Sequence, residues 1–251
     1  MNKEEQMICS HLLDLAEACD RRGYPMGSDF LTLNEQNLFL AFSKDKLPPV
    51  SMEMCGGYEL AERKIIFYKP VGVGEEYPAP ISLLSVQPLM KKFSEELTHR
   101  DYLGALMHLG IERSCLGDIL VQGHTAYVFC LEKMAELICR EVTRIRHTTV
   151  MAVKETLSEI PSPRIQDVTG TVSSVRLDSV LAVAFGLSRN KAIPYIEGGQ
   201  VYVNARQVVS NGYGLHPGDL ISVRGLGKFR YVDVRNQSKK GKYWIDIQKF
   251  V

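Results

Sequence analysis

Three consecutive residues, Arg189, Asn190 and Lys191, have the residue types and the spacing to bind an anion. They follow Ser188, a residue type favoured at the N-cap of a helix, so we expect them in the first helical turn. Free backbone N–H groups and the positive end of the helix dipole lie in that turn. Cations there cost an isolated helix about 0.3–1 kcal/mol each, and a phosphate that they attract together explains their position.

Polar and basic residues recur after the paired glycines Gly198 and Gly199. A β-forming segment leads from these glycines to a turn, and a glycine-rich hairpin follows further along the chain. Both could place donors beside the helix start. The residues concerned are Asn204, Arg206, Arg224, Lys228 and Arg230. The alternative interpretation is a basic surface that only keeps a small domain hydrated.

The distribution of charge distinguishes the C-terminal part from the rest. The 251 residues have a net charge of +1, which is uninformative for the whole chain. Residues 173–251 hold 12 Lys and Arg against 5 Asp and Glu, and residues 1–172 hold 18 against 24. The C-terminal part is therefore basic and the remainder mildly acidic. This asymmetry favours a nucleic-acid-binding module on an acidic body, and we expect its ligand to be structured RNA rather than DNA.

Two charged clusters outside the basic part could be read as acid–base machinery. His99, Arg100 and Asp101 are adjacent, and side chains at adjacent helical positions point in different directions, so they do not form a triad by themselves. Helix capping by Thr98 and Asp101 explains this run at least as well. The second cluster, Glu62-Arg63-Lys64, is interpreted as surface or inter-domain ion pairs. We predict no catalytic residue. Secondary contacts with RNA or between domains are assigned to Arg63, Lys64, His99 and Arg100.

Cysteine usage and hydropathy exclude several classes of protein. The six cysteines include no CxxC pair, which argues against a disulfide scaffold and a zinc site and suits a reducing cytoplasm. No apolar run approaches the roughly 20 residues needed to span a bilayer. The N-terminal segment has the pattern of an amphipathic charged helix rather than of a signal peptide. We expect a cytoplasmic monomer with no cofactor, no metal and no membrane association.

The order of predicted elements indicates an α+β fold. Residues 1–78 have a mixed pattern, with helices around residues 12–19 and from Asn34, and a strand at 64–70. Residues 79–160 follow the order strand, helix, hairpin, helix, strand. In this region the first strand is 81–88, the hairpin turns at Gly123 and the last strand is 148–153. This β-α-β-β-α-β order is the split βαβ pattern, so a ferredoxin-like domain is predicted.

The remaining residues are predicted to be a linker and a small domain. Residues 161–173 contain two prolines and a polar run, which is typical of a linker. Residues 174–251 are predicted to contain helices at 177–185 and 189–197, followed by strands. We therefore expect residues 172–251 to fold and bind RNA alone. Because Arg189 and Lys191 are expected on the surface, changing both to Glu should leave folding nearly intact.

The C-terminal pattern resembles the S-four RNA-binding domain, which is named for a ribosomal small-subunit protein. The resemblance covers residues 174–234 and adds Arg176 to the predicted RNA-binding residues. Two positions depart from the domain's pattern, because Ala205 replaces the usual glycine and Pro194 lies inside the second helix. The matching runs are Arg176-Leu177-Asp178, Ser188-Arg189, Ala192, Ile196, Gly199, Val201, Val203-Asn204, Gly218-Asp219 and Ile221–Gly225.

Nearly the whole chain resembles the YlmH family of bacterial proteins. The runs Gly56–Lys64 and Thr98–Ile119 are similar to its two signatures, in order and at suitable spacing. The resemblance implies an RNA-binding protein that associates with the large ribosomal subunit, contacting ribosomal RNA and peptidyl-tRNA during rescue of stalled ribosomes. Two alternatives stay open. One is an RNA-modifying enzyme with a site around His99, Arg100 and Asp101, and the other is a protein-interaction adaptor linked to cell division.

Overall fold

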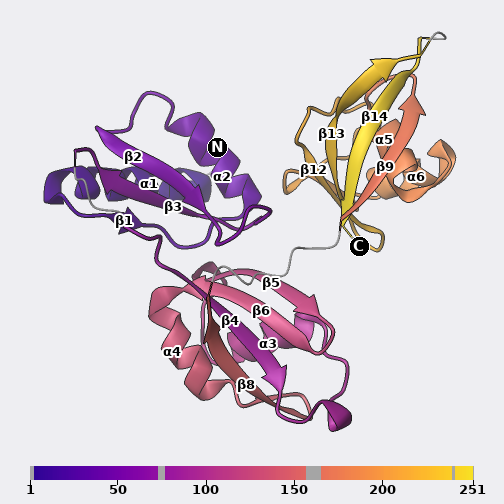
Figure 1. The fold of residues 1–251 in the computed structure, drawn as a ribbon. Helices are drawn as coiled ribbons and strands as arrows, with labels where there is room; N and C mark the ends of the chain where they lie inside the picture. The colour runs from indigo at the N-terminus through magenta and orange to yellow at the C-terminus, as the bar shows by residue number, and fades with distance from the viewer. Residues whose placement is uncertain (1–2, 73–76, 157–164, 239–240, 251) are drawn as a thin grey trace. The chain divides into compact units, whose positions relative to one another are not determined.

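The structure, a computed structural model, describes residues 3–72, 77–156, 165–238 and 241–250. The chain separates into two compact units, Met1–Pro161 and Ser162–Val251 (Figure 1). Both units combine antiparallel sheets with helices, which confirms the predicted α+β class.

The first part of unit one is a three-stranded sheet with two helices. Helix α1 (Lys3–Arg22) lies along one face of the sheet and buries an apolar stripe that includes Leu12, Ala16 and Cys19. Helix α2 (Leu33–Phe42) begins after Thr32, whose backbone N–H donates to the Glu35 carboxylate at 2.6 Å in a capping box. The strands run in the order β1 (Met26–Gly27), β3 (Ile65–Pro70) and β2 (Val50–Cys55).

The second part of unit one is a five-stranded sheet in the order β5-β6-β4-β8-β7. When the short β7 is left out, the four strands in chain order are β4, β5, β6 and β8. The first of them, β4, lies between the third, β6, and the fourth, β8, as a ferredoxin-like plait requires. The predicted split βαβ arrangement is confirmed. Gly123 has φ 59° in the β5–β6 turn, as its position in the hairpin predicts. The elements are β4 (Ile81–Pro88), η1 (Lys91–Phe93), α3 (His99–His108), η2 (Arg113–Cys115), β5 (Leu116–Gln122), β6 (Thr125–Leu131), α4 (Glu132–Glu141), β7 (Arg144–Ile145) and β8 (Thr148–Glu155).

The two sheets of unit one share a hydrophobic core. Phe30, Ile65 and Phe67 come from the N-terminal part and belong to the same buried cluster as the residues of β4 and β6. This explains why residues 1–161 form one compact unit. The predicted division into residues 1–78 and 79–160 follows the two sheets.

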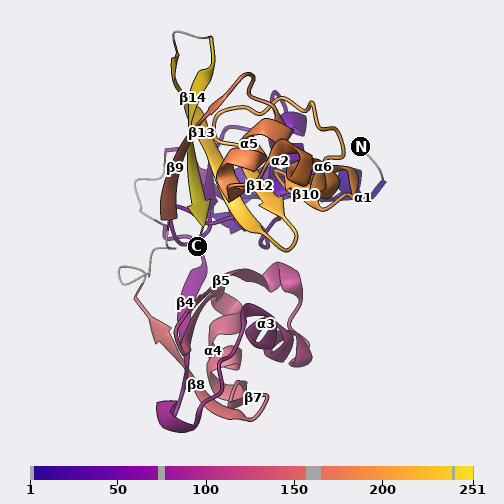
Figure 2. The ribbon, with the colours of Figure 1, turned by 90° about the vertical axis from the view of Figure 1, so that its right-hand side faces the viewer.

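Unit two is a six-stranded antiparallel sheet with two helices on one face (Figure 2). The strand order is β11-β10-β12-β13-β14-β9. Helix α5 packs closely on the edge strand β9 at Gly170. A Cβ added to this glycine would lie 2.4 Å from a methyl group of Val183 in α5, so a side chain there would require Val183 to shift. The elements are β9 (Ile165–Val172), α5 (Leu177–Phe185), α6 (Arg189–Glu197), β10 (Val201–Val203), β11 (Arg206–Gln207), β12 (Leu220–Val223), β13 (Gly227–Gln237) and β14 (Tyr243–Phe250).

The predicted linker is wrong over most of its length. Residues Ile165–Val172 form β9, which pairs with β14 from Ile165–Phe250 to Val172–Tyr243. Residues 161–164 lie outside the described part of the chain. Val172 and the partly buried Val168 pack on the core of unit two, so β9 belongs to this unit. A fragment that starts at residue 172 therefore lacks an edge strand, and the expectation that it folds alone is not supported.

Candidate nucleic-acid interface

The start of α6 is tied to the start of α5 by an ion pair between Arg189 and Asp178. Arg189 Nε donates to Asp178 Oδ2 at 3.1 Å, and Nη2 donates to the same oxygen. The Asp178 side chain is 5% exposed, whereas Arg189 is 49% exposed. Burial raises the pKa of Asp178, but hydrogen bonds from Arg189 and Ser179 outweigh it, so the pKa lies below its usual range. Arg189 is therefore not simply a surface residue, and its ion pair with a buried carboxylate argues against the expectation that its replacement by Glu spares folding.

The other residues at this helix start are exposed. Ser188 has the extended backbone of an N-cap residue, but its side chain makes no capping hydrogen bond. Asn190 and Lys191 are both exposed in the first turn. Of the two cations in this turn, Arg189 pairs with the buried carboxylate of Asp178, whereas Lys191 does not. The predicted helix start is confirmed. Anion binding there stays a prediction.

Asn204 has a structural role in the turn between β10 and β11. Its side-chain N–H donates to Asp219 at 2.8 Å, and its side-chain oxygen accepts from the backbone N–H of Leu220 at 3.0 Å. Asn204 and Ala205 have φ of 49° and 63°, the left-handed pair that a two-residue hairpin turn requires. A glycine would suit position 205 better, which accounts for the domain's usual residue there. Asn204 thus fixes the hairpin and has both ends of its side chain occupied.

The basic residues of the β12–β13 hairpin lie on the face of the sheet opposite the helices. Lys228 and Arg230 alternate with Phe229 and Tyr231, whose side chains are buried in the core with α5 and α6. Residues that alternate along a strand point to opposite faces. Lys228 pairs with Ser222, which in turn pairs with Tyr202. These side chains therefore form a row across the helix-free face.

The three remaining predicted arginines lie at the ends of elements: Arg224 follows β12, Arg206 begins β11 and Arg176 precedes α5. Arg224 stacks over the ring of Tyr202 at 5.0 Å from its centroid, a cation–π contact at the hairpin end. Arg206 pairs with Val203, whose side chain is in the helix-side core, and Arg176 is the exposed N-cap residue of α5. The predicted residues thus divide between two faces of the sheet, and the structure does not gather them into one patch.

Arg63, assigned to secondary contacts, joins the two sheets of unit one. Its Nε donates to the carbonyl of Leu116 at 2.9 Å, and its Nη2 donates to the carbonyl of Phe30 at 2.8 Å. Burial lowers the pKa of Arg63. Burial also lowers the pKa of neighbouring Arg113, and the positive charge of Arg63 adds to this effect, so that the pKa of Arg113 is about 10. Arg63 is therefore an internal clamp. Lys64 pairs through its backbone with Leu31 in the same region.

Asp118 completes this set of contacts between the sheets, although no local sequence pattern marks it as a site residue. Its carboxylate accepts from the hydroxyl of Tyr58 at 2.8 Å and from the backbone N–H groups of Glu62 and Arg63 at 2.7 and 3.2 Å. Gly57 has φ 90°, and a Cβ there would lie 2.5 Å from the ring of Phe129. The segments Gly56–Lys64 and Thr98–Ile119 thus meet in space through their polar atoms. The role of Asp118 depends on this proximity of the two segments, which the sequence alone does not reveal.

The His99–Asp101 run is a helix cap. The backbone N–H and the hydroxyl of Thr98 donate to the Asp101 carboxylate at 2.8 and 2.7 Å, as the capping-box prediction required. Arg146 approaches the other carboxylate oxygen at 3.6 Å. These hydrogen bonds lower the pKa of Asp101. His99 and Arg100 are exposed in the same turn. The carboxylate is occupied in capping and is poorly placed to act as a general base.

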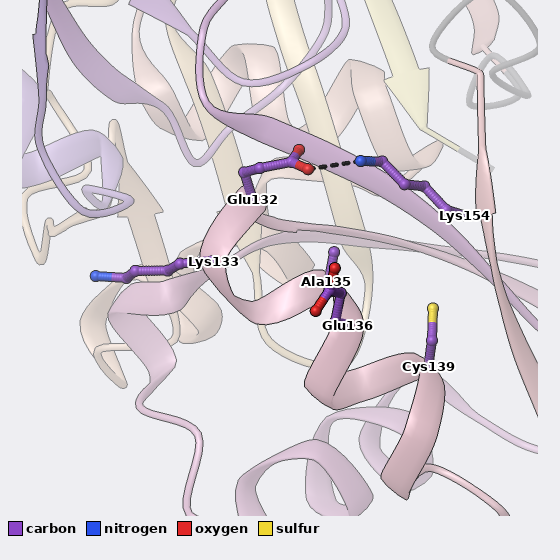
Figure 3. Close-up of a pocket in the computed structure, with 6 residues that line it drawn as sticks. All are labelled: Glu132, Lys133, Ala135, Glu136, Cys139 and Lys154. Carbon is purple, nitrogen blue, oxygen red and sulfur yellow. Dashed lines mark hydrogen bonds and ion pairs between the residues drawn. The ribbon is translucent and has the colours of Figure 1, made fainter.

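A cavity of about 370 Å³ lies between α4 and β8 in unit one (Figure 3). Its lining includes two glutamates and two lysines, so its formal charges cancel. Glu132 accepts from Lys154 at 2.5 Å and from the hydroxyl of Ser82, so this carboxylate is occupied. Cys139 also lines the cavity. No group of three or more His, Cys, Asp or Glu side chains suited to a metal ion occurs among the described residues. The cavity therefore lacks the uncompensated charge that would select an ionic ligand.

The chain combines a two-sheet α+β unit with a small basic C-terminal unit, and the domains matched below make it an RNA-binding protein. Among the described helices, none is long and apolar enough to cross a membrane. A family model described as "Putative RNA-binding domain in YlmH" matches residues 77–159, and the S4 domain matches residues 175–221.

Two known proteins are similar over most of their own length. Ribosome-associated protein quality control protein P2 of Bacillus subtilis (strain 168) is 30% identical over 250 residues, which is 98% of this chain and 96% of that protein. The structure of cell division protein ylmH from Streptococcus pneumoniae has a TM-score of 0.53 at 17% identity, and the match covers 63% of this chain and 95% of that one. The second similarity concerns the fold alone. The chain belongs to the YlmH family.

Proposed function

We propose that this protein is a non-catalytic RNA-binding factor that associates with the large ribosomal subunit in ribosome-associated quality control. The observation that carries the RNA-binding part is the S4 domain within a basic unit that exposes Lys191, Arg206 and Arg224. Such cations bind phosphate and position a protein on an RNA backbone. The ribosomal part is supported by the near full-length similarity to a relative whose name states ribosome association and quality control.

The proposed ligand is structured RNA, with large-subunit ribosomal RNA as the main contact and peptidyl-tRNA as a further one. Double-stranded RNA is recognised mainly through phosphates and 2′-hydroxyls, which suits a domain rich in Lys and Arg. The protein acts as a cytoplasmic monomer in this proposal. An enzymatic role around His99 and Asp101 is disfavoured because the Asp101 carboxylate is held by Thr98.

The test is co-sedimentation of the full chain with purified large and small ribosomal subunits, together with binding to a structured RNA at several salt concentrations. If three to five phosphates are contacted, log K falls with log salt at a slope of roughly −2 to −4. Binding to large subunits with such a slope supports the proposal. Equal binding to both subunits, or an affinity independent of salt, contradicts it. A change in the mass of the RNA after incubation, with or without S-adenosylmethionine, would instead indicate an enzyme.

A further inference from the structure

A second cavity, of about 320 Å³, lies in unit two where the end of β9 meets α5 and the start of α6. Its polar lining consists of the hydroxyl residues Thr171, Ser173 and Ser179 and the basic residues Arg189 and Lys242. Among the described residues that line it, none is acidic. Its volume is at the lower end of the range for ligand pockets, about 300–1,000 Å³. The cavity therefore combines hydroxyl donors with positive charge.

Strand register brings Lys242 to this cavity. Tyr243 pairs with Val172 in the β14–β9 ladder, so the preceding Lys242 lies beside Ser173, which follows Val172. The backbone N–H of Lys242 donates to the hydroxyl of Ser238 at 3.0 Å, which fixes the main chain where the turn joins β14. Its side-chain ammonium makes no ion pair or hydrogen bond with the described residues. Lys242 thus supplies a charge that is not neutralised within the described structure.

Arg189 supplies the second charge and is already oriented by Asp178. Only Nε and Nη2 of its guanidinium bond the buried carboxylate, and the side chain remains 49% exposed. An arginine held on one side and open on the other is preorganised to donate to an oxyanion. Asp178 does not line the cavity, and its carboxylate accepts hydrogen bonds from Arg189 and Ser179. The cavity is therefore lined by the arginine and not by the carboxylate that pairs with it.

We propose that this cavity binds one phosphate group of the RNA backbone, with Lys242 and Arg189 supplying charge and Ser173 supplying a hydroxyl donor. The inference rests on the proposed RNA-binding function and deepens it. Lys242 and Ser173 both lie outside residues 175–221, which match the S4 domain. The strands β9 and β14 thus extend the RNA-binding surface beyond that domain, and Lys242 is a binding residue that neither the motif nor the first-turn pattern indicates.

The experiment compares three variants of the full chain for binding to a structured RNA by fluorescence anisotropy at several salt concentrations. Lys242→Glu removes the proposed contact. Lys249→Glu makes the same charge change at the other end of β14, where the lysine stacks over Phe185 instead of lining the cavity. Ser173→Asp places a negative charge in the cavity without removing a lysine. Circular dichroism establishes that each variant is folded.

We expect Lys242→Glu and Ser173→Asp to weaken RNA binding about tenfold, the low end for a hydrogen bond to a charged group. Loss of the phosphate contact in Lys242→Glu should also make the salt slope shallower by about one. Lys249→Glu should have a clearly smaller effect. Equal weakening by both lysine variants, or unchanged binding in folded Ser173→Asp, overturns the cavity proposal and leaves the proposed function standing.

Titration with inorganic phosphate distinguishes the two sources of the anion. Chemical shift changes at the amides of Ser173, Ser179 and Lys242 that are lost in Lys242→Glu support an anion site. If wild-type protein shows these shifts but binds neither RNA nor ribosomal subunits, the proposed function fails and the cavity is a site for a free phosphate. If phosphate causes no such shifts, and if RNA binding is intact and does not depend on Lys242, the cavity proposal is refuted. The proposed RNA-binding function then still stands.

Discussion

Arg189 at the start of α6 donates two hydrogen bonds to one oxygen of Asp178 at the start of α5, and the carboxylate is almost fully buried. The pair joins two helices that are connected by a tight turn at Gly186, which has φ 63°. A residue predicted to bind RNA thus also joins two helices of unit two, so its replacement tests folding and binding at once.

Replacement of Arg189 should destabilise unit two. In Arg189→Ala the buried Asp178 loses its cation, and we expect a loss of about 2 kcal/mol, reduced from the value for a fully buried pair because Arg189 is half exposed. Urea unfolding measures the difference. Lys191→Ala is the matched control at an exposed position of the same turn and should be neutral within about 0.5 kcal/mol. Equal stability of the two variants would show that the ion pair contributes little.

The same pair predicts a pH dependence with a defined sign. The pKa of Asp178 is lowered in the folded state, so its contribution to stability is fully present above the unfolded pKa of about 3.9. That contribution is lost as the pH falls through the lowered folded-state pKa. The difference in unfolding free energy between wild type and Arg189→Ala should therefore be constant near pH 6 and shrink below about pH 4. A difference that persists undiminished to pH 2 would contradict this assignment.

Replacement of Asp118 should loosen the junction between the two sheets of unit one. Asp118→Ala leaves the hydroxyl of Tyr58 and the backbone N–H groups of Glu62 and Arg63 without their acceptor. An unpaired buried donor costs about 1–3 kcal/mol, and these three donors are partly buried, so we expect a total loss of about 3 kcal/mol in chemical unfolding. The exposed Asp45→Ala is the control. Binding of structured RNA by folded Asp118→Ala should stay near the wild-type level, because the main proposed contacts, Lys191, Arg206 and Arg224, lie in unit two. A large loss of affinity would assign part of the RNA surface to unit one.

The boundary of unit two can be tested with two fragments. A fragment of residues 162–251 keeps β9, whereas one of residues 173–251 leaves β14 as an unpaired edge and removes Val172 from the core. We expect the longer fragment to unfold cooperatively with urea and the shorter one to be less stable by several kcal/mol and prone to association. Similar midpoints for both would restore the linker interpretation of residues 165–172.

Helices and their ends were largely predictable because their signals are local. The prediction of α3 rested on Thr98 and Asp101, which lie within one helical turn, and the structure shows the predicted capping box. The turn at Gly123 follows from the two residues around it. The split βαβ order followed from these local elements taken in sequence.

Residue roles were less predictable where the partner is remote in sequence. Asn204 has the type of a phosphate ligand, yet its side chain bonds Asp219 and Leu220. Lys228 and Arg230 were grouped with the start of α6, but the strand places them on the helix-free face. Lys242 has no motif around it and reaches the second cavity only through the pairing of β14 with β9.

The sequence by itself determined the α+β class, most helices and the concentration of positive charge in the C-terminal part, since these depend on composition and on residues within a few positions of one another. Tertiary structure alone decided that Ile165–Val172 is a strand, that Arg189 pairs with Asp178, and that Arg63 and Asp118 clamp two sheets. Strand pairing and burial of a charge depend on which distant segments come together. Which segments come together is determined by the free energy of the whole unit, and a local sequence pattern does not contain that information.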